Sequence, residues 1–145
     1  MTEIFKMTKD DADGAAEIDR RCFSVPWSKK SFLEEAENGI AVYFIAKDGE
    51  KYVGYGGFWN VYPEGDITNV AVVPDYRRQG IATAILKEMI KKARVLKLNC
   101  LNLEVRRSNH AAQRLYAEFG FEVAGERKRY YSDNREDALI MKLNL

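Results

Sequence analysis

A strand that runs into a helix through a short glycine turn is the feature that most constrains the fold of this sequence. Residues 66–73, DITNVAVV, read as a strand, and from Gly80 to about Leu96 the apolar residues keep helical spacing. The connection PDYRRQ (74–79) places two arginines and a glutamine where Ser, Thr or Asp would normally cap the helix. The stretch is therefore either an ordinary turn with solvated arginines or a set of free amides that binds a ligand.

Phosphate is the natural ligand of such amides, because the first N–H groups of a helix lack intrahelical partners and lie at the positive end of its dipole. Gly80 removes a side chain that would block close approach, Ala82 keeps the next contact small, and Thr83 can add a hydroxyl. Arg77 and Arg78 contribute positive charge nearby. The spacing fits neither GxGxxG nor GxxxxGK[ST], which excludes the Rossmann and P-loop motifs.

The remaining pattern predicts one α/β domain over residues 1–145, with a mixed sheet and helices packed on it. Further strands are expected at 41–46, 51–60, 100–106, about 121–131 and 136–144. Three more helices are expected: from a cap at Asp10 or Asp11 to about Arg21, after a cap at Ser28, and over NHAAQRLYAEFG to a stop at Gly120. The order is β-hairpins followed by β-α-β-α-β-β.

Composition excludes several classes of protein. The 23 Lys and Arg against 22 Asp and Glu give a formal charge of +1, which provides no general attraction to nucleic acid or membrane. The charged amino terminus has no signal core, and no apolar run approaches the ~20 residues that span a bilayer. Cys22 and Cys100 lack metal-ligand spacing and read as small buried hydrophobes, and His110 is the sole histidine. We therefore expect a cytoplasmic protein without a metal site. We also expect a monomer or weak dimer.

Four blocks in the same order resemble one family. VAVVPDYRRQGIATAIL is similar to the acetyl-CoA-binding motif of the GNAT superfamily of N-acetyltransferases, Gln/Arg-x-x-Gly-x-Gly/Ala, which Arg77, Gly80 and Ala82 match. VPWS, LEVRRSNHAAQRLYAEFGF and ERKRYYSDNREDALIMKL resemble the RimI branch, the bacterial ribosomal-protein-alanine N-acetyltransferases. The resemblance implies the GNAT acyl-CoA N-acyltransferase fold, a mostly antiparallel central sheet flanked by helices.

The resemblance also implies acetyl-CoA as cosubstrate and assigns residues to it. The backbone of one strand would hold the acetyl and pantetheine portion, and the loop amides would hold the pyrophosphate. The implied strand residues are Val70, Ala71 and Val72, and the implied loop residues are Arg78, Gln79, Gly80, Ile81, Ala82 and Thr83. Asn109 matches the family asparagine that contacts the cofactor.

Acetyl transfer to an amine needs a neutral amine, a stabilised oxyanion and a proton for the departing thiolate. Glu104 lies on the polar face of LNLEVR, where an exposed carboxylate is the ordinary alternative, and the resemblance makes it the general base. Tyr116 shares a helical stripe with Leu115 and Phe119 that is typical of core, and the block LYAEFGF makes it the general acid. A backbone N–H near Val72 would stabilise the oxyanion.

The acceptor that the resemblance implies is a protein amino terminus, favoured as the N-terminal alanine of a small-subunit ribosomal protein. Trp27 and Tyr131 would contact the peptide, although tandem tyrosines such as Tyr130 and Tyr131 commonly pack across strands. Glu64 and Asp66 are either solvated charge or an attraction for a basic peptide. Alternatives are a broader Nα-, lysine or small-amine acetyltransferase, and a CoA-binding module without catalysis, which would need neither a base nor an acid. A nucleic-acid-binding domain is disfavoured by the net charge.

Overall fold

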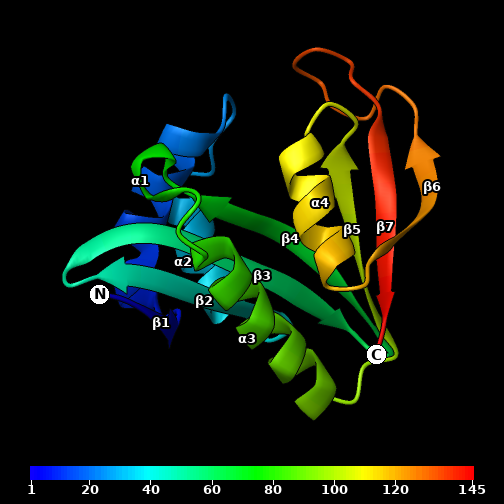
Figure 1. Ribbon diagram of the computed structural model, residues 1–145. Helices are drawn as coiled ribbons and strands as arrows, with labels where there is room; N and C mark the ends of the chain where they lie inside the picture. Colours follow the sequence, from blue (N-terminus) through cyan, green and yellow to red (C-terminus); the bar gives the residue numbers. More distant parts are fainter.

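A seven-stranded sheet lies at the centre of the computed structural model, which describes residues 1–145 (Figure 1). The strand order is β1-β2-β3-β4-β5-β7-β6, and every neighbouring pair is antiparallel except β4 with β5. The strands are β1 (Thr2–Lys6), β2 (Ala41–Asp48), β3 (Lys51–Val61), β4 (Glu64–Val72), β5 (Cys100–Arg106), β6 (Glu122–Arg127) and β7 (Ala138–Asn144). This mostly antiparallel mixed sheet with flanking helices confirms the predicted fold class.

Helices cover both faces of the sheet. They are α1 (Ala12–Cys22), α2 (Lys29–Glu37), α3 (Ile81–Val95) and α4 (His110–Glu118), with 3-10 turns at Lys9–Asp11 and Pro74–Tyr76. Tyr55 of β3 packs against Phe32 of α2, with ring centroids 5.3 Å apart. A Cβ placed on the next residue, Gly56, would lie 2.7 Å from Cγ2 of Ile85 in α3. Because successive side chains of a strand point to opposite faces, α2 and α3 lie on opposite sides of β3.

The apolar stripe of α3 forms a large part of the core, as its helical spacing predicts. Its buried residues are Ile81, Ile85, Leu86, Met89, Ile90 and Ala93. Full burial of each large side chain contributes ~1.5–3 kcal/mol. The strand β3 accommodates this helix closely because Gly56 has no side chain where Ile85 and Met89 pack.

Three local features differ from the prediction. The strand β1 was not expected, because most of its residues are exposed and its alternation is weak. The helix cap was expected at Asp10 or Asp11; Asp11 is the N-cap residue of α1 but makes no side-chain capping hydrogen bond to it. Thr8 is the residue whose side chain caps the preceding 3-10 turn, and Asp11 accepts a hydrogen bond from the Thr8 N–H at 2.8 Å. The last two strands are also shorter than expected, so Tyr130 and Tyr131 lie in the connection between β6 and β7.

The parallel pair β4–β5 positions the candidate site. These strands pair only at residues 64–66 and 100–102. Beyond that point they diverge, as Figure 1 shows, and residues 67–72 and 103–106 do not pair with each other. We call the opening between these two segments the wedge.

Candidate active site

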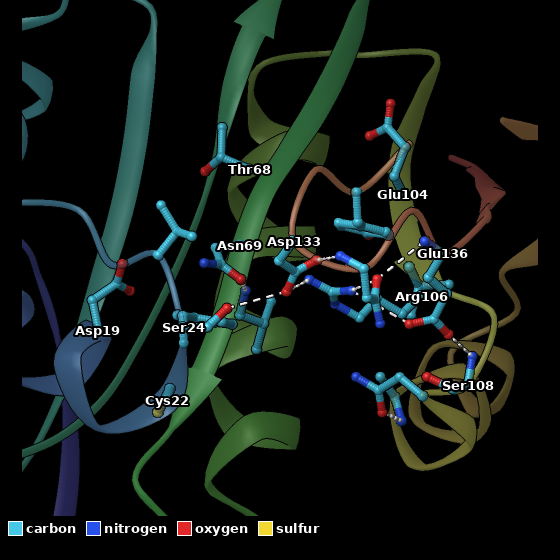
Figure 2. A pocket seen from close by; sticks show the side chains of 18 of the residues that line it. Asp19, Cys22, Ser24, Thr68, Asn69, Glu104, Arg106, Ser108, Asp133 and Glu136 are labelled. Atoms are coloured by element: carbon cyan, nitrogen blue, oxygen red, sulfur yellow. Dashed lines mark hydrogen bonds and ion pairs between the residues drawn. The ribbon is translucent and has the colours of Figure 1, made fainter. Parts of the chain in front are cut away.

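A cavity of about 660 Å³ fills the wedge and gathers residues from five separate parts of the chain. Figure 2 shows its two walls, with Asp19, Cys22 and Asn69 on one side and Glu104 and Arg106 on the other. Six of the predicted site residues line it: Trp27, Val70, Glu104, Asn109, Tyr116 and Tyr131. The catalytic and acceptor-contact candidates therefore lie around one space, although they are far apart in the sequence.

The edge of β4 that faces the wedge carries backbone groups without a partner on a neighbouring strand. The Val73 N–H donates to the Val53 carbonyl at 2.9 Å. Because backbone groups alternate in direction along an antiparallel pair, those of Ala71 then point to β3, whereas those of Val70 and Val72 point into the wedge. Of the three strand residues predicted to hold the cosubstrate by their backbone, Val70 and Val72 have the required direction and Ala71 does not.

The start of α3 presents six amides without protein partners. The N–H groups of residues 78–83 donate no hydrogen bond within the protein, and the first helical bond joins the Ala84 N–H to the Gly80 carbonyl at 3.0 Å. Gly80 is the N-cap and has φ of +79°, a conformation that strongly favours glycine. A Cβ there would meet nothing within 4 Å, so the requirement for glycine is conformational within the protein. This exposed cradle fits a pyrophosphate group.

The Arg77 side chain forms its hydrogen bonds within the protein. Its Nε donates to the Val72 carbonyl at 2.9 Å, and a terminal nitrogen of its guanidinium lies 3.8 Å from the Cys22 sulfur. The arginine thereby fastens the loop to the end of β4. The Arg77 side chain is therefore less available than expected for direct contact with a phosphate, whereas Arg78 is exposed and forms no ion pair.

Glu104 projects from the middle of β5, and its side chain is 32% exposed. One carboxylate oxygen accepts a hydrogen bond from Arg127 Nε at 3.3 Å. A second cavity of about 470 Å³ lies beside the first, and the two share only Trp27, Thr68 and Glu104. The candidate base is thus a boundary residue between two cavities, as a group that acts between two substrates must be.

Tyr116 combines a core position with access to the cavity. The residue is 7% exposed, and its ring packs against Phe121 with centroids 5.5 Å apart. Its hydroxyl makes no hydrogen bond to a protein group, and the residue lines the larger cavity. Burial raises the pKa of Tyr116 above its ordinary value of ~10. The hydroxyl is therefore protonated at neutral pH and available as a donor.

Asn109 forms the N-cap of α4, where its Oδ1 accepts the Ala112 N–H at 3.1 Å. Its Nδ2 donates to no protein group, which leaves a donor at the cavity wall. Trp27 lines both cavities and is 37% exposed. Of the cysteines, Cys100 is buried as expected, whereas Cys22 is only partly buried because it lines the cavity.

Arg106 organises a cluster that sequence reasoning did not identify. Its guanidinium binds Asp133 at 2.9 Å and Glu136 at 3.3 Å, and it stacks on the Tyr131 ring at 4.0 Å from the centroid. Asp133 also accepts a hydrogen bond from Ser24 at 3.1 Å, which joins the two walls of the wedge (Figure 2). Burial raises the pKa of Tyr131 to about 12. The position of Arg106 on the same strand face as Glu104 was the available signal.

Three further residues escaped prediction because their roles depend on long-range contacts. They are Asp19, Tyr55 and Asn69, and two of them, Asp19 and Asn69, line the larger cavity. No group of three or more His, Cys, Asp or Glu side chains is arranged to hold a metal ion. None of the helices has the length and apolar character needed to cross a membrane.

Comparison with known proteins identifies the family. Residues 12–121 match the model of the acetyltransferase (GNAT) family. The chain is 36% identical over 145 residues to the ribosomal protein bS18-alanine N-acetyltransferase of Escherichia coli K12, which covers 99% of this chain and 97% of that protein. A Bacillus subtilis (strain 168) relative, which carries the same name provisionally, is 41% identical over 139 residues, or 95% of this chain and 92% of the relative.

Solved structures agree. The crystal structure of the Escherichia coli enzyme superposes with a TM-score of 0.91 over 99% of this chain and 94% of that chain. The fold is also shared with the PaiA N-acetyltransferase of Thermoplasma acidophilum, solved with coenzyme A, at 18% identity and a TM-score of 0.84 over 100% and 99% of the two chains. The protein belongs to the GNAT family of acetyltransferases. It is an acetyltransferase, and acetyl-CoA is its cosubstrate.

Proposed function

We propose that the protein transfers the acetyl group of acetyl-CoA to the N-terminal α-amine of a protein, namely the N-terminal alanine of ribosomal protein bS18. The observation that carries this proposal is the position of Glu104 between two cavities, in a chain 36% identical over 99% of its length to an enzyme named for that reaction. An acceptor among the ribosomal proteins makes the cytoplasm the site of the reaction.

Two side chains have complementary proton-transfer roles in this proposal. Glu104 accepts the proton of the attacking amine, directly or through one water, and Tyr116 donates a proton to the departing thiolate. An α-amine, with a pKa of ~8, is roughly one-tenth neutral at pH 7, whereas a lysine side chain with a pKa of ~10.4 is almost wholly protonated. An amino terminus therefore depends less on the general base than a lysine side chain does.

The wedge-facing backbone supplies the other requirements. The N–H of Val72 points into the wedge and has no protein partner, so it serves as the oxyanion donor. The six free amides at the start of α3 and the Nδ2 of Asn109 would hold the phosphate and neighbouring portions of the cosubstrate. These groups bind and orient, which leaves the proton transfers to Glu104 and Tyr116.

The smaller cavity is the proposed approach of the acceptor. Its walls include the aromatic side chains of Trp27, Trp59 and Tyr130, and its two carboxylates, Asp66 and Glu104, outnumber its one cationic side chain, Arg127. Aromatic walls suit an extended peptide, and carboxylates attract its cationic amino terminus. This surface supports a peptide acceptor more than a small free amine.

Mass spectrometry of two matched peptides tests the function. One peptide carries the bS18 amino-terminal sequence with a free α-amine, and the other has the same sequence with that amine already blocked and its side-chain amines free. We expect one acetyl group on the first peptide, at its α-amine, and none on the second. Acetylation of side-chain lysines alone would contradict the proposal.

A further inference from the structure

Asp19, in the last turns of α1, is the only charged side chain that is fully buried, with 2% of its surface exposed. It forms no ion pair. One carboxylate oxygen accepts the Trp27 N–H at 2.8 Å, and the other accepts the Tyr55 hydroxyl. Because an uncompensated buried carboxylate is costly, a fold that retains one without a cation gains little stability from it. A role for Asp19 therefore lies in the groups that its two hydrogen bonds hold in place.

These bonds are part of a longer chain of hydrogen bonds beside the larger cavity. The Tyr55 hydroxyl, which donates to Asp19, also accepts a hydrogen bond from Asn69 Nδ2 at 3.0 Å, and Asn69 Oδ1 accepts the Val70 N–H at 3.1 Å. The chain therefore runs from the loop at Trp27, through Asp19 and Tyr55, to a wedge-facing amide of β4. Trp27 lines both cavities, so the two ends of the chain lie at the acceptor side and the cosubstrate side.

We propose that Asp19 is a positioning residue for the acetyl transfer. Its carboxylate holds the loop that carries Trp27 in place. Through Tyr55 it also orients the Asn69 side chain, whose Oδ1 accepts the Val70 N–H. The proposal rests on the proposed function, because it takes Trp27 as a wall of the acceptor site. It does not involve the start of α3, which lies outside the hydrogen-bonded chain.

The protein contains a matched pair for comparison at the other end of α1. The Tyr52 hydroxyl, also from β3, donates to Asp11 at 2.7 Å, and neither residue lines either of the two cavities of the site. Tyr52→Phe therefore removes a tyrosine–aspartate hydrogen bond between β3 and the N-terminal end of α1. It leaves the hydrogen-bonded chain that starts at Asp19 unchanged. It controls for the general loss of such a bond.

Steady-state kinetics with the bS18 peptide separates the two arms of the chain. In Asp19→Ala both carboxylate acceptors are lost, so the Trp27 N–H and the Tyr55 hydroxyl each lose this partner; we expect the peptide KM to rise at least about tenfold and kcat to fall. Tyr55→Phe leaves the bond to Trp27 intact, so kcat falls while the peptide KM stays within about twofold of wild type. The Kd of acetyl-CoA stays within about twofold in both variants.

Amide hydrogen exchange measures the loop independently of any acceptor. The Trp27 N–H should exchange at least about tenfold faster in Asp19→Ala and keep its protection in Tyr52→Phe and Tyr55→Phe. Failure of wild-type protein to acetylate the peptide would refute the proposed function alone. Unchanged Trp27 exchange, or kinetic losses no greater than those of Tyr52→Phe, would refute the positioning role. If Asp19→Ala does not fold, the drop in kcat of Tyr55→Phe against Tyr52→Phe decides.

Discussion

At the scale of single residues, one side chain of this site can serve both in packing and in proton transfer. Tyr116 fills a core position against Phe121 and still lines the cavity with an unpaired hydroxyl. Glu104 is partly exposed, as an ordinary polar-face carboxylate would be, yet it lies where two cavities meet. The ordinary interpretations and the catalytic ones are therefore compatible for both residues.

Conservative substitutions test these roles. Glu104→Gln and Tyr116→Phe keep the shape of each side chain and remove the ability to accept or donate the proton, so kcat should fall by about 10²–10⁴. The Kd of acetyl-CoA, measured by calorimetry, should change little. Retention of acetyl transfer within about twofold of wild type would contradict the assignment. Glu126→Gln, at an exposed ion-paired carboxylate outside both cavities, is the matched control.

At the scale of elements, the start of α3 depends on backbone geometry. Gly80 and Arg78 both have positive φ, +79° and 64°, which turns the chain so that six consecutive amides stay free of protein partners. A cap by Ser or Asp would have used one or two of these amides. The missing cap is thus the condition for anion binding at this helix.

Gly80→Ala tests this geometry. An alanine must adopt a left-handed conformation there, which should lower the free energy of unfolding by about 1–2 kcal/mol, and its methyl group would crowd the bound pyrophosphate and raise the KM of acetyl-CoA. Gly49→Ala is the control, because Gly49 has φ of +62° and equally open surroundings in the β2–β3 turn. Equal KM values for the two variants would refute a binding role for the α3 start.

At the scale of the whole molecule, charges hold the wedge together. Arg106 binds Asp133 and Glu136, and Asp133 reaches Ser24 on the opposite wall. The Arg106 guanidinium lowers the pKa of Asp133, and hydrogen bonds from Ser108 and then Arg106 lower the pKa of Glu136. Burial acts in the opposite direction on Asp19 and raises its pKa.

These shifts determine how stability depends on pH. A carboxyl group whose pKa is lower in the folded state stabilises the fold above its unfolded pKa of ~4, and the contribution is lost as the pH falls through the folded value. Asp19 partly opposes this loss, since its protonation relieves the cost of burial. We expect the free energy of unfolding, measured in urea, to fall below about pH 4. Arg106→Gln should flatten that fall, and an unchanged slope would contradict the role of the cluster.

The sequence by itself determined the elements, the family and the cosubstrate. Helical spacing predicted α3, clean alternation predicted β5, and the uncapped glycine turn predicted the free amides. These features are local, because spacing, alternation and capping depend on neighbours within a few residues. The edge strand β1 was missed because its exposure leaves little alternation to detect.

Only the tertiary structure decided how the site is built. The register of β4 against β3 directed the backbone groups of Val70 and Val72, but not of Ala71, away from β3, and the divergence of β4 from β5 after three paired residues left that edge open as the wedge. The tertiary structure also brought Asp19 to Tyr55 across 36 positions and Arg106 to Asp133 across 27. No local pattern encodes such contacts, because they are fixed by how the sheet opens and by which helices cover it.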